Sequence, residues 1–320
     1  MTSAPAPAGP LPEQPRLLPG TAVARRDAQH VQVGLDARAA VLPDTPEVRR
    51  VLGALQEGSP LAADVRDAPG AALALDRLHT AGLLVDGPTL RTSLASYAAG
   101  PVERAALAAT WCADPAGAAA RWAVRRQAVV AVDGPSPDRV TVERLLATAG
   151  VPTCTGPPDV VLVLREGQPD RCELDALTQQ DRPHLLVHGE LDHVVLGPFV
   201  APGRTACLRC LDAHLADVDP RRPLVLEQQA DVTAPAPLDP VLWQLALAWA
   251  VRDVLRWVDG ERPSTWSATV RLGPDPSPQR REWLRHPRCG CGWAELAAHQ
   301  CSGASLPSIE RRCSREQVSQ

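Results

Sequence analysis

Apolar residues near the N-terminus occur in short runs separated by turn residues. Between residues 21 and 42 this pattern predicts three antiparallel strands, over 22–26, 30–34 and 38–42. Three helices are predicted next. The first begins at Asp44-Thr45-Pro46, and the others cover 59–66 and 71–80. Residues 83–92 contain an Asp-Gly turn and are expected to form a wing-like hairpin, so this part of the chain is typical of a winged helix.

The pattern changes after an Ala- and Arg-rich stretch of helical spacing. An unbroken apolar run at 128–132 is typical of a buried parallel strand, and helices and strands then alternate. Helices are predicted over 141–149, 173–179 and 238–258, and strands over 160–164, 185–188 and 193–199. This alternation predicts an α/β sheet. The predicted organisation is a disordered tail (1–19), a winged-helix domain (20–92), a helical connector (93–126), an α/β domain (127–300) and a loose C-terminal tail (301–320).

Composition narrows the class of protein. Charged residues make up 22% of the 320 residues and the net charge is −4, so no overall positive field is available to gather nucleic acid or anionic lipid. The chain contains no lysine, which excludes any mechanism that needs one from this chain. No signal peptide and no membrane-spanning apolar run is recognised, so a cytoplasmic location is expected. In that compartment the nine cysteines are interpreted first as thiols or metal ligands.

Two closely spaced cysteine pairs are the strongest chemical signal. Cys207 and Cys210 form a CxxC, and Cys289 and Cys291 form a CxC 79 residues later. Four thiolates in two pairs satisfy a closed tetrahedral site, so a structural Zn²⁺ is predicted, with Thr205 as the expected cap of the helix that carries the first pair. The alternative is that the four cysteines are small buried residues. Nearby polar residues are interpreted as helix-end groups or partners of the ligands rather than as catalytic groups: Asp212, His214, Asp217, Asp219 and His286.

The first predicted strand of the α/β domain lacks a phosphate loop. Asp133-Gly-Pro-Ser-Pro-Asp138 follows it, and the two prolines remove backbone donors while the two aspartates place negative charge where a phosphate would bind. The sequence therefore predicts a nucleotide-type fold that does not bind ATP.

The segment Gly197-Pro-Phe-Val-Ala-Pro-Gly-Arg-Thr-Ala-Cys-Leu-Arg-Cys210, with the later His286-Pro-Arg-Cys-Gly-Cys291, resembles a known family. It is similar to the ThiF-like leader-peptide-binding proteins of thiazole/oxazole-modified microcin (bacteriocin) biosynthesis, also called the cyclodehydratase-domain family, within the ubiquitin-activating-enzyme-like superfamily. The resemblance covers most of residues 20–293. It implies an N-terminal winged-helix peptide-recognition domain and a ThiF-like, Rossmann-like α/β domain with a Cys₄ zinc site.

The resemblance implies a function without catalysis by this chain. The N-terminal domain would bind the leader of a ribosomally made precursor peptide as an added strand, and the α/β domain would dock a YcaO-type cyclodehydratase that uses ATP to form thiazoline or oxazoline rings. The resemblance places the peptide groove at the third strand and the third helix, lined by Arg38, Ala40, Leu42, Leu73, Arg77 and Thr80. Arg38 and Arg77 are expected to pair with acidic leader residues. The alternative is that Leu42 and Leu73 fill the small core.

Two other functions compete with this interpretation. An ATP-dependent ThiF-type adenylyltransferase is opposed by the missing lysine and the proline-containing loop. A winged-helix DNA-binding regulator is opposed by charge, because residues 20–90 contain seven Arg and nine acidic residues. The expected partners are therefore a precursor leader peptide and a YcaO-type enzyme, with neither nucleic acid nor membrane. The sequence leaves open whether the chain forms a homodimer.

Overall fold

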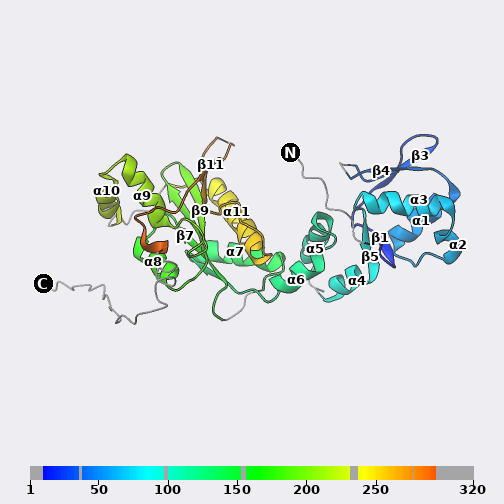
Figure 1. Ribbon diagram of the computed structural model, residues 1–320, viewed down its shortest axis with the longest axis horizontal. Coiled ribbons are helices and arrows are strands. Elements are labelled where there is room, and N and C mark those ends of the chain that lie inside the picture. Colours follow the sequence, from blue (N-terminus) through cyan, green and yellow to red (C-terminus); the bar gives the residue numbers. More distant parts are fainter. Residues whose placement is uncertain are drawn as a thin grey trace, which may run out of the picture. The chain divides into compact units, whose positions relative to one another are not determined.

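The computed structural model describes residues 10–35, 38–96, 100–152, 156–230, 237–275 and 277–292. The chain is mixed α/β (Figure 1) and divides into two compact units. The first comprises residues 1–159 and 247–263, and the second comprises 160–246 and 264–320. Among the described helices, none combines the length and the apolar character needed to cross a membrane. The predicted C-terminal tail lies outside the described residues.

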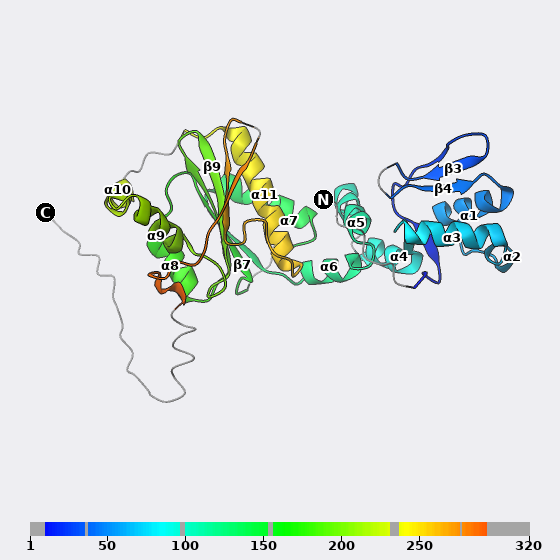
Figure 2. The same cartoon turned by 45° about the horizontal axis from the view of Figure 1, so that its top comes forward.

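The first unit contains a three-stranded antiparallel sheet, as predicted. Its order is β2 (Val23–Arg25), β3 (His30–Val33) and β4 (Ala40–Pro43). Helices α1 (Pro46–Glu57), α2 (Ala63–Arg66) and α3 (Pro69–Thr80) follow, and Figure 2 shows α1 and α3 beside this sheet. The apolar stripe of α1 and the inward side chains of β3 and β4 form one core cluster with α3.

The ends of α1 follow from local chemistry. Thr45 is the N-cap, and its hydroxyl oxygen accepts a hydrogen bond from the Val48 amide at 3.3 Å. Gly58 ends the helix with a φ of 73°, a left-handed conformation that glycine adopts without steric cost.

The predicted hairpin at 83–92 is wrong. β5 (Leu84–Asp86) is followed directly by α4 (Gly87–Ser96). The Asp86 carboxylate accepts hydrogen bonds from the backbone and hydroxyl of Thr89, at 3.0 and 2.6 Å, so this aspartate starts a helix instead of a hairpin turn. The strand partner of β5 is β1 (Pro15–Leu17), which pairs with it antiparallel inside the range 1–19 that the sequence predicts as a disordered tail.

The rest of the first unit is built around two tryptophans. Helices α5 (Pro101–Ala113) and α6 (Ala118–Arg125) occupy the connector range and bury Trp111 and Trp122 in a second core cluster. Arg125, at the end of α6, forms a buried ion pair with Asp259 at 2.5 Å. β6 (Val130–Asp133) and α7 (Ser136–Thr148) follow.

The sheet of the second unit has the strand order β11-β10-β9-β8-β7. In the second unit, β7 (Val160–Arg165) and β8 (His184–Glu190) are parallel, whereas β9 (His193–Val200), β10 (Ala268–Leu272) and β11 (Gln279–Glu282) continue antiparallel. Helices α8 (Arg171–Gln179) and α9 (Leu208–Val218) pack against each other on one face of these strands (Figures 1 and 2). Helices α10 (Arg222–Ala230) and α11 (Pro240–Val258) complete the described elements, of which β10, β11 and α10 carry no clear signal in the sequence.

Candidate metal centre

The CxxC pair lies at the start of α9. Cys207 is the N-cap, and its carbonyl accepts hydrogen bonds from the amides of Cys210 and Leu211, at 3.0 and 3.3 Å. This geometry places both sulfurs on one side of the first turn. The prediction that Thr205 caps this helix is wrong. The Thr205 hydroxyl instead forms hydrogen bonds with the backbone of Ala201 and closes the loop that precedes the helix.

Cys291 of the CxC pair lies in a short 3₁₀ turn, Gly290–Gly292, and Cys289 directly precedes this turn. Two hydrogen bonds to His286 shape the approach to this turn. The amide of Cys289 donates to the His286 carbonyl at 3.0 Å, and the amide of Arg288 donates to His286 Nδ1 at 3.1 Å.

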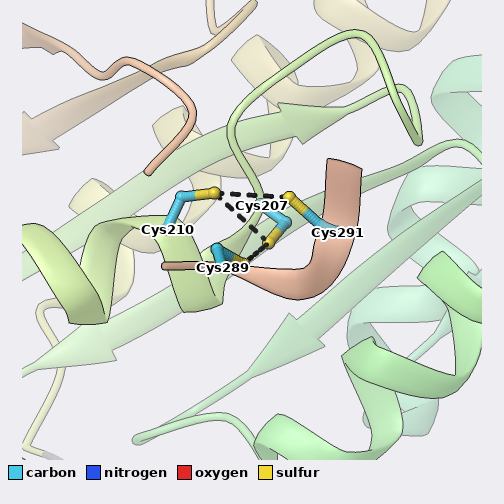
Figure 3. Close-up of side chains that lie close together, drawn as sticks. All are labelled: Cys207, Cys210, Cys289 and Cys291. Atoms are coloured by element: carbon cyan, nitrogen blue, oxygen red, sulfur yellow. Dashed lines mark hydrogen bonds between the residues drawn. The ribbon is translucent and has the colours of Figure 1, made fainter. Parts of the chain in front are cut away.

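The four sulfurs converge on one point, although they come from segments far apart in sequence (Figure 3). The Sγ–Sγ distances are 3.8 Å for Cys207–Cys210, 3.6 Å for Cys207–Cys289 and 3.4 Å for Cys210–Cys291. A tetrahedral site with metal–sulfur bonds of about 2.3 Å has edges of about 3.8 Å. The sulfurs are therefore spaced closely enough to hold a metal ion.

Burial and mutual contact control the ionisation of these thiols. Cys207 and Cys210 are buried, and Cys289 and Cys291 are half-buried. Hydrogen bonding with Cys207 holds the pKa of Cys210 below its usual range and lowers the pKa of Cys289 to about 7. Hydrogen bonding to Cys210 raises the pKa of Cys207. Four sulfurs this close cannot all ionise without a cation between them, which is the chemistry of a thiolate metal site.

A second polar cluster supports the CxC turn. His286 is buried, and its Nε2 lies 2.9 Å from the carboxylate of Asp217, which also pairs with Arg288. The hydrogen bond with His286, followed by the charge of Arg288, lowers the pKa of Asp217. His214 donates from Nε2 to the Leu284 carbonyl at 2.9 Å. Because both ring nitrogens of His286 form hydrogen bonds within the protein, this cluster holds the CxC turn in place.

A cavity of about 970 Å³ adjoins the sulfurs. Its walls come from α8, α9, α10 and residues 288–291, and three of the clustered cysteines line it, Cys207, Cys289 and Cys291. Two ion pairs cross its wall, Arg171–Asp212 at 3.2 Å and Arg209–Asp175 at 2.8 Å. Asp212 therefore serves packing between α8 and α9, and the exposed thiol of Cys172 lies in the same wall.

The structure separates the six residues of the predicted peptide groove. Leu42 has no exposed surface, and Ala40 is also buried, so both belong to the core between the sheet and the helices. The prediction that Leu42 lines an open groove is wrong, because the inward face of β4 is covered by α1 and α3 in the free chain. Leu73 is 44% exposed, which contradicts the alternative that it fills the core.

The three polar residues of that prediction also differ in their surroundings. Arg38 donates to the Cys112 carbonyl at 2.7 Å and is therefore tied to α5. Arg77 and Thr80 are exposed on α3, and Arg77 Nη1 donates to the Val41 carbonyl of β4 at 2.9 Å. Arg77 is thus the predicted cation that lies at the strand edge.

The direction of each backbone group on β4 follows from its neighbours. The amide of Asp44 donates to the Gln29 carbonyl, so Asp44, Leu42 and Ala40 face β3, whereas Val41 and Pro43 face the open edge. The same alternation on β2 places Ala24 toward β3 and Val23 and Arg25 outward. Sequence alternation predicts side-chain faces but does not identify these edge groups.

The fold is similar to those of several solved structures. A heterocyclase in complex with substrate and cofactor has a TM-score of 0.63 and 17% identity over 93% of this chain and 41% of that chain. The heterocyclase TruD has a TM-score of 0.65 and 19% identity over 95% of this chain and 46% of that chain. E. coli MccB with MccA has a TM-score of 0.58 and 14% identity over 87% of this chain and 99% of that chain.

These likenesses show a shared fold. The chain spans less than half the length of the two heterocyclases. No protein-family model matches the sequence, and no curated protein matches it.

Proposed function

We propose that this chain is a non-catalytic scaffold of peptide heterocycle biosynthesis. It binds the leader of a ribosomally made precursor and presents the peptide to a separate YcaO-type cyclodehydratase, which forms thiazoline or oxazoline rings. One observation carries the proposal: the likeness to heterocyclases extends over 93–95% of this chain, hence over both units, yet covers only 41–46% of theirs. In this proposal the ring-forming activity belongs to a separate YcaO-type protein.

The peptide-binding part of the proposal rests on the edge of β4. Val41 directs its backbone toward the open side of the sheet, and an extended peptide can pair with it as an added strand. On the facing helix, Leu73 and Thr80 are exposed and provide the opposite wall. In this proposal the side chains of Ala40 and Leu42 do not contact the peptide. They pack in the core and hold β4 against the helices.

The metal in this proposal is zinc with a structural role. Four thiolates satisfy a tetrahedral ion completely, and sulfur ligands in this geometry favour Zn²⁺ among the metals available in cells. The ion would join the start of α9 to the CxC turn across 82 residues of sequence. It would fix the wall of the cavity that α8, α9 and α10 share.

The proposal assigns ATP chemistry to the partner. One solved structure with the same fold is E. coli MccB with ATP, at a TM-score of 0.55. In the present chain Pro135 is the N-cap of α7, Pro137 lies in its first turn, and Asp138 adds a buried carboxylate there. A helix start with few amide donors and a negative charge disfavours phosphate binding.

A display library of random linear peptides, selected on the purified full chain, tests the peptide-binding role. The informative variant is Val41→Pro, which removes an outward N–H and leaves the bonds from β4 to β3 intact. Ala40→Pro would not serve, because the Ala40 amide faces β3. We expect Val41→Pro to bind selected peptides at least about fivefold more weakly.

The matched control is Val23→Pro, which removes an outward N–H from the opposite edge of the same sheet. This variant should bind the selected peptides as the parent chain does. Equal binding by all three chains would contradict docking at the β4 edge. Failure to select any peptide would contradict the leader-binding role.

A further inference from the structure

The guanidinium of Arg77 occupies a backbone group that an added strand needs. It reaches from α3 to β4 and donates to the Val41 carbonyl at 2.9 Å. Val41 and Pro43 are the outward-facing residues of β4. A strand that pairs with β4 would donate its own N–H to this carbonyl, so the peptide and Arg77 compete for the same oxygen.

The neighbouring edge groups offer little replacement. Pro43 has no N–H, and its carbonyl accepts a hydrogen bond from the Thr45 amide at 3.0 Å. Within Ala40–Pro43, Val41 therefore provides the N–H and the carbonyl through which a strand can pair. Strand addition at this edge depends on the release of Arg77.

Other cations near this edge are held by different partners. Arg38 is bonded to the Cys112 carbonyl, and Arg49 makes two contacts with the Asp44 carboxylate, at 2.5 and 2.7 Å. Among the described residues, the hydrogen-bond partner of the Arg77 guanidinium is the Val41 carbonyl. Its release therefore leaves a charged donor beside the bound peptide.

We propose that Arg77 makes this edge selective for acidic extended peptides, an inference that rests on the proposed function. A neutral strand takes the Val41 carbonyl and leaves the guanidinium with water. A strand with Asp or Glu near the residue that pairs with Val41 accepts the displaced guanidinium in a charge-assisted hydrogen bond. The acidic side chain thereby offsets the loss of the Arg77–Val41 contact, and the neutral peptide binds more weakly.

The size of the selectivity follows from exposure. Arg77 lies on the surface of α3, where solvent screens an ion pair. An exposed pair of good geometry changes affinity on the order of fivefold. Removal of the guanidinium should also release the Val41 carbonyl, which favours the binding of neutral peptides.

The test combines Arg77→Met with peptides selected on the parent chain, each compared with versions in which one Glu or Asp is replaced by Gln or Asn. Methionine keeps the helix propensity of α3 and removes the charge. At one acidic position, we expect the amide version to bind the parent chain about fivefold more weakly than the acidic peptide does. On Arg77→Met, the two peptides should bind equally well. Arg77→Met should also bind that amide version more tightly than the parent chain does.

The control is Arg50→Met, which removes an exposed arginine from α1 and should leave both affinities as in the parent chain. If every amide version loses the same affinity on the parent chain and on Arg77→Met, the inference is overturned. It is also overturned if no acidic position affects binding to the parent chain. Peptides that bind without dependence on Val41 contradict the proposed docking edge, so the two failures are distinguishable.

Discussion

Cys210→Ser removes one of the four clustered sulfurs of the second unit. Cys210 has no exposed surface, and its sulfur lies 3.4 Å from that of Cys291 and 3.8 Å from that of Cys207. A metal held by all four sulfurs joins segments separated by 82 residues. In a chain-entropy treatment, a cross-link over such a loop destabilises the unfolded chain by about 4.5 kcal/mol. Loss of the metal should therefore lower the melting temperature on the order of 10–18 °C.

The assay combines elemental analysis with scanning calorimetry of the purified chain, before and after treatment with a chelator. The parent chain should hold about one zinc ion and lose it to the chelator together with this stability. Cys172→Ser is the matched control, because Cys172 is an exposed thiol in the wall of the same cavity. It should retain the metal and the melting temperature. The reasoning is refuted if Cys210→Ser binds zinc as the parent does and melts at the same temperature.

Three further predictions concern the core, the acid sensitivity of the Glu190 carboxylate, and nucleotide binding. Leu42→Ala should lower the free energy of unfolding by about 3 kcal/mol in urea titrations, since the side chain is fully buried; a loss below about 1 kcal/mol would contradict its place in the core. A hydrogen bond from His188 lowers the pKa of Glu190 to about 2, so its carboxylate stabilises the folded state above pH 4.5, and this stabilisation is lost as the pH falls toward 2. Between pH 5 and 2, the free energy of unfolding of Glu190→Gln should therefore fall by about 1–2 kcal/mol less than that of the parent chain. The same decrease for both chains in urea titrations would argue against this. Calorimetric titration of the chain with Mg·ATP should give no binding heat, whereas micromolar affinity would favour the adenylyltransferase alternative.

The sequence predicts the features that depend on local chemistry. Thr45 and Pro46 define the start of α1, and the spacing of the four cysteines predicts that their sulfurs meet. Asp86-Gly87 shows the limit of this reasoning, because the same dipeptide suits a hairpin turn and a helix start. The decisive partner of β5 is β1, about 70 residues earlier in the chain, and a strand of three residues that begins with a proline has no alternation to detect.

The peptide edge shows a different limit. Period-two alternation places Ala40 and Leu42 on one face of β4, but it does not state whether that face is open or covered by a helix. Nor does it indicate which amides face outward, because this depends on the pairing of β3 with both of its neighbours. The contact between Arg77 and Val41 joins residues 36 positions apart, so it emerges only when α3 is packed beside the sheet.

Reconstitution of ring formation tests the central claim most directly. A precursor peptide and a YcaO-type enzyme are incubated with ATP, with and without this chain, and mass spectrometry follows the loss of one water per ring formed. The account predicts that efficient water loss requires this chain, and that Val41→Pro reduces it while Val23→Pro does not. Equal modification with and without the chain would contradict the scaffold role.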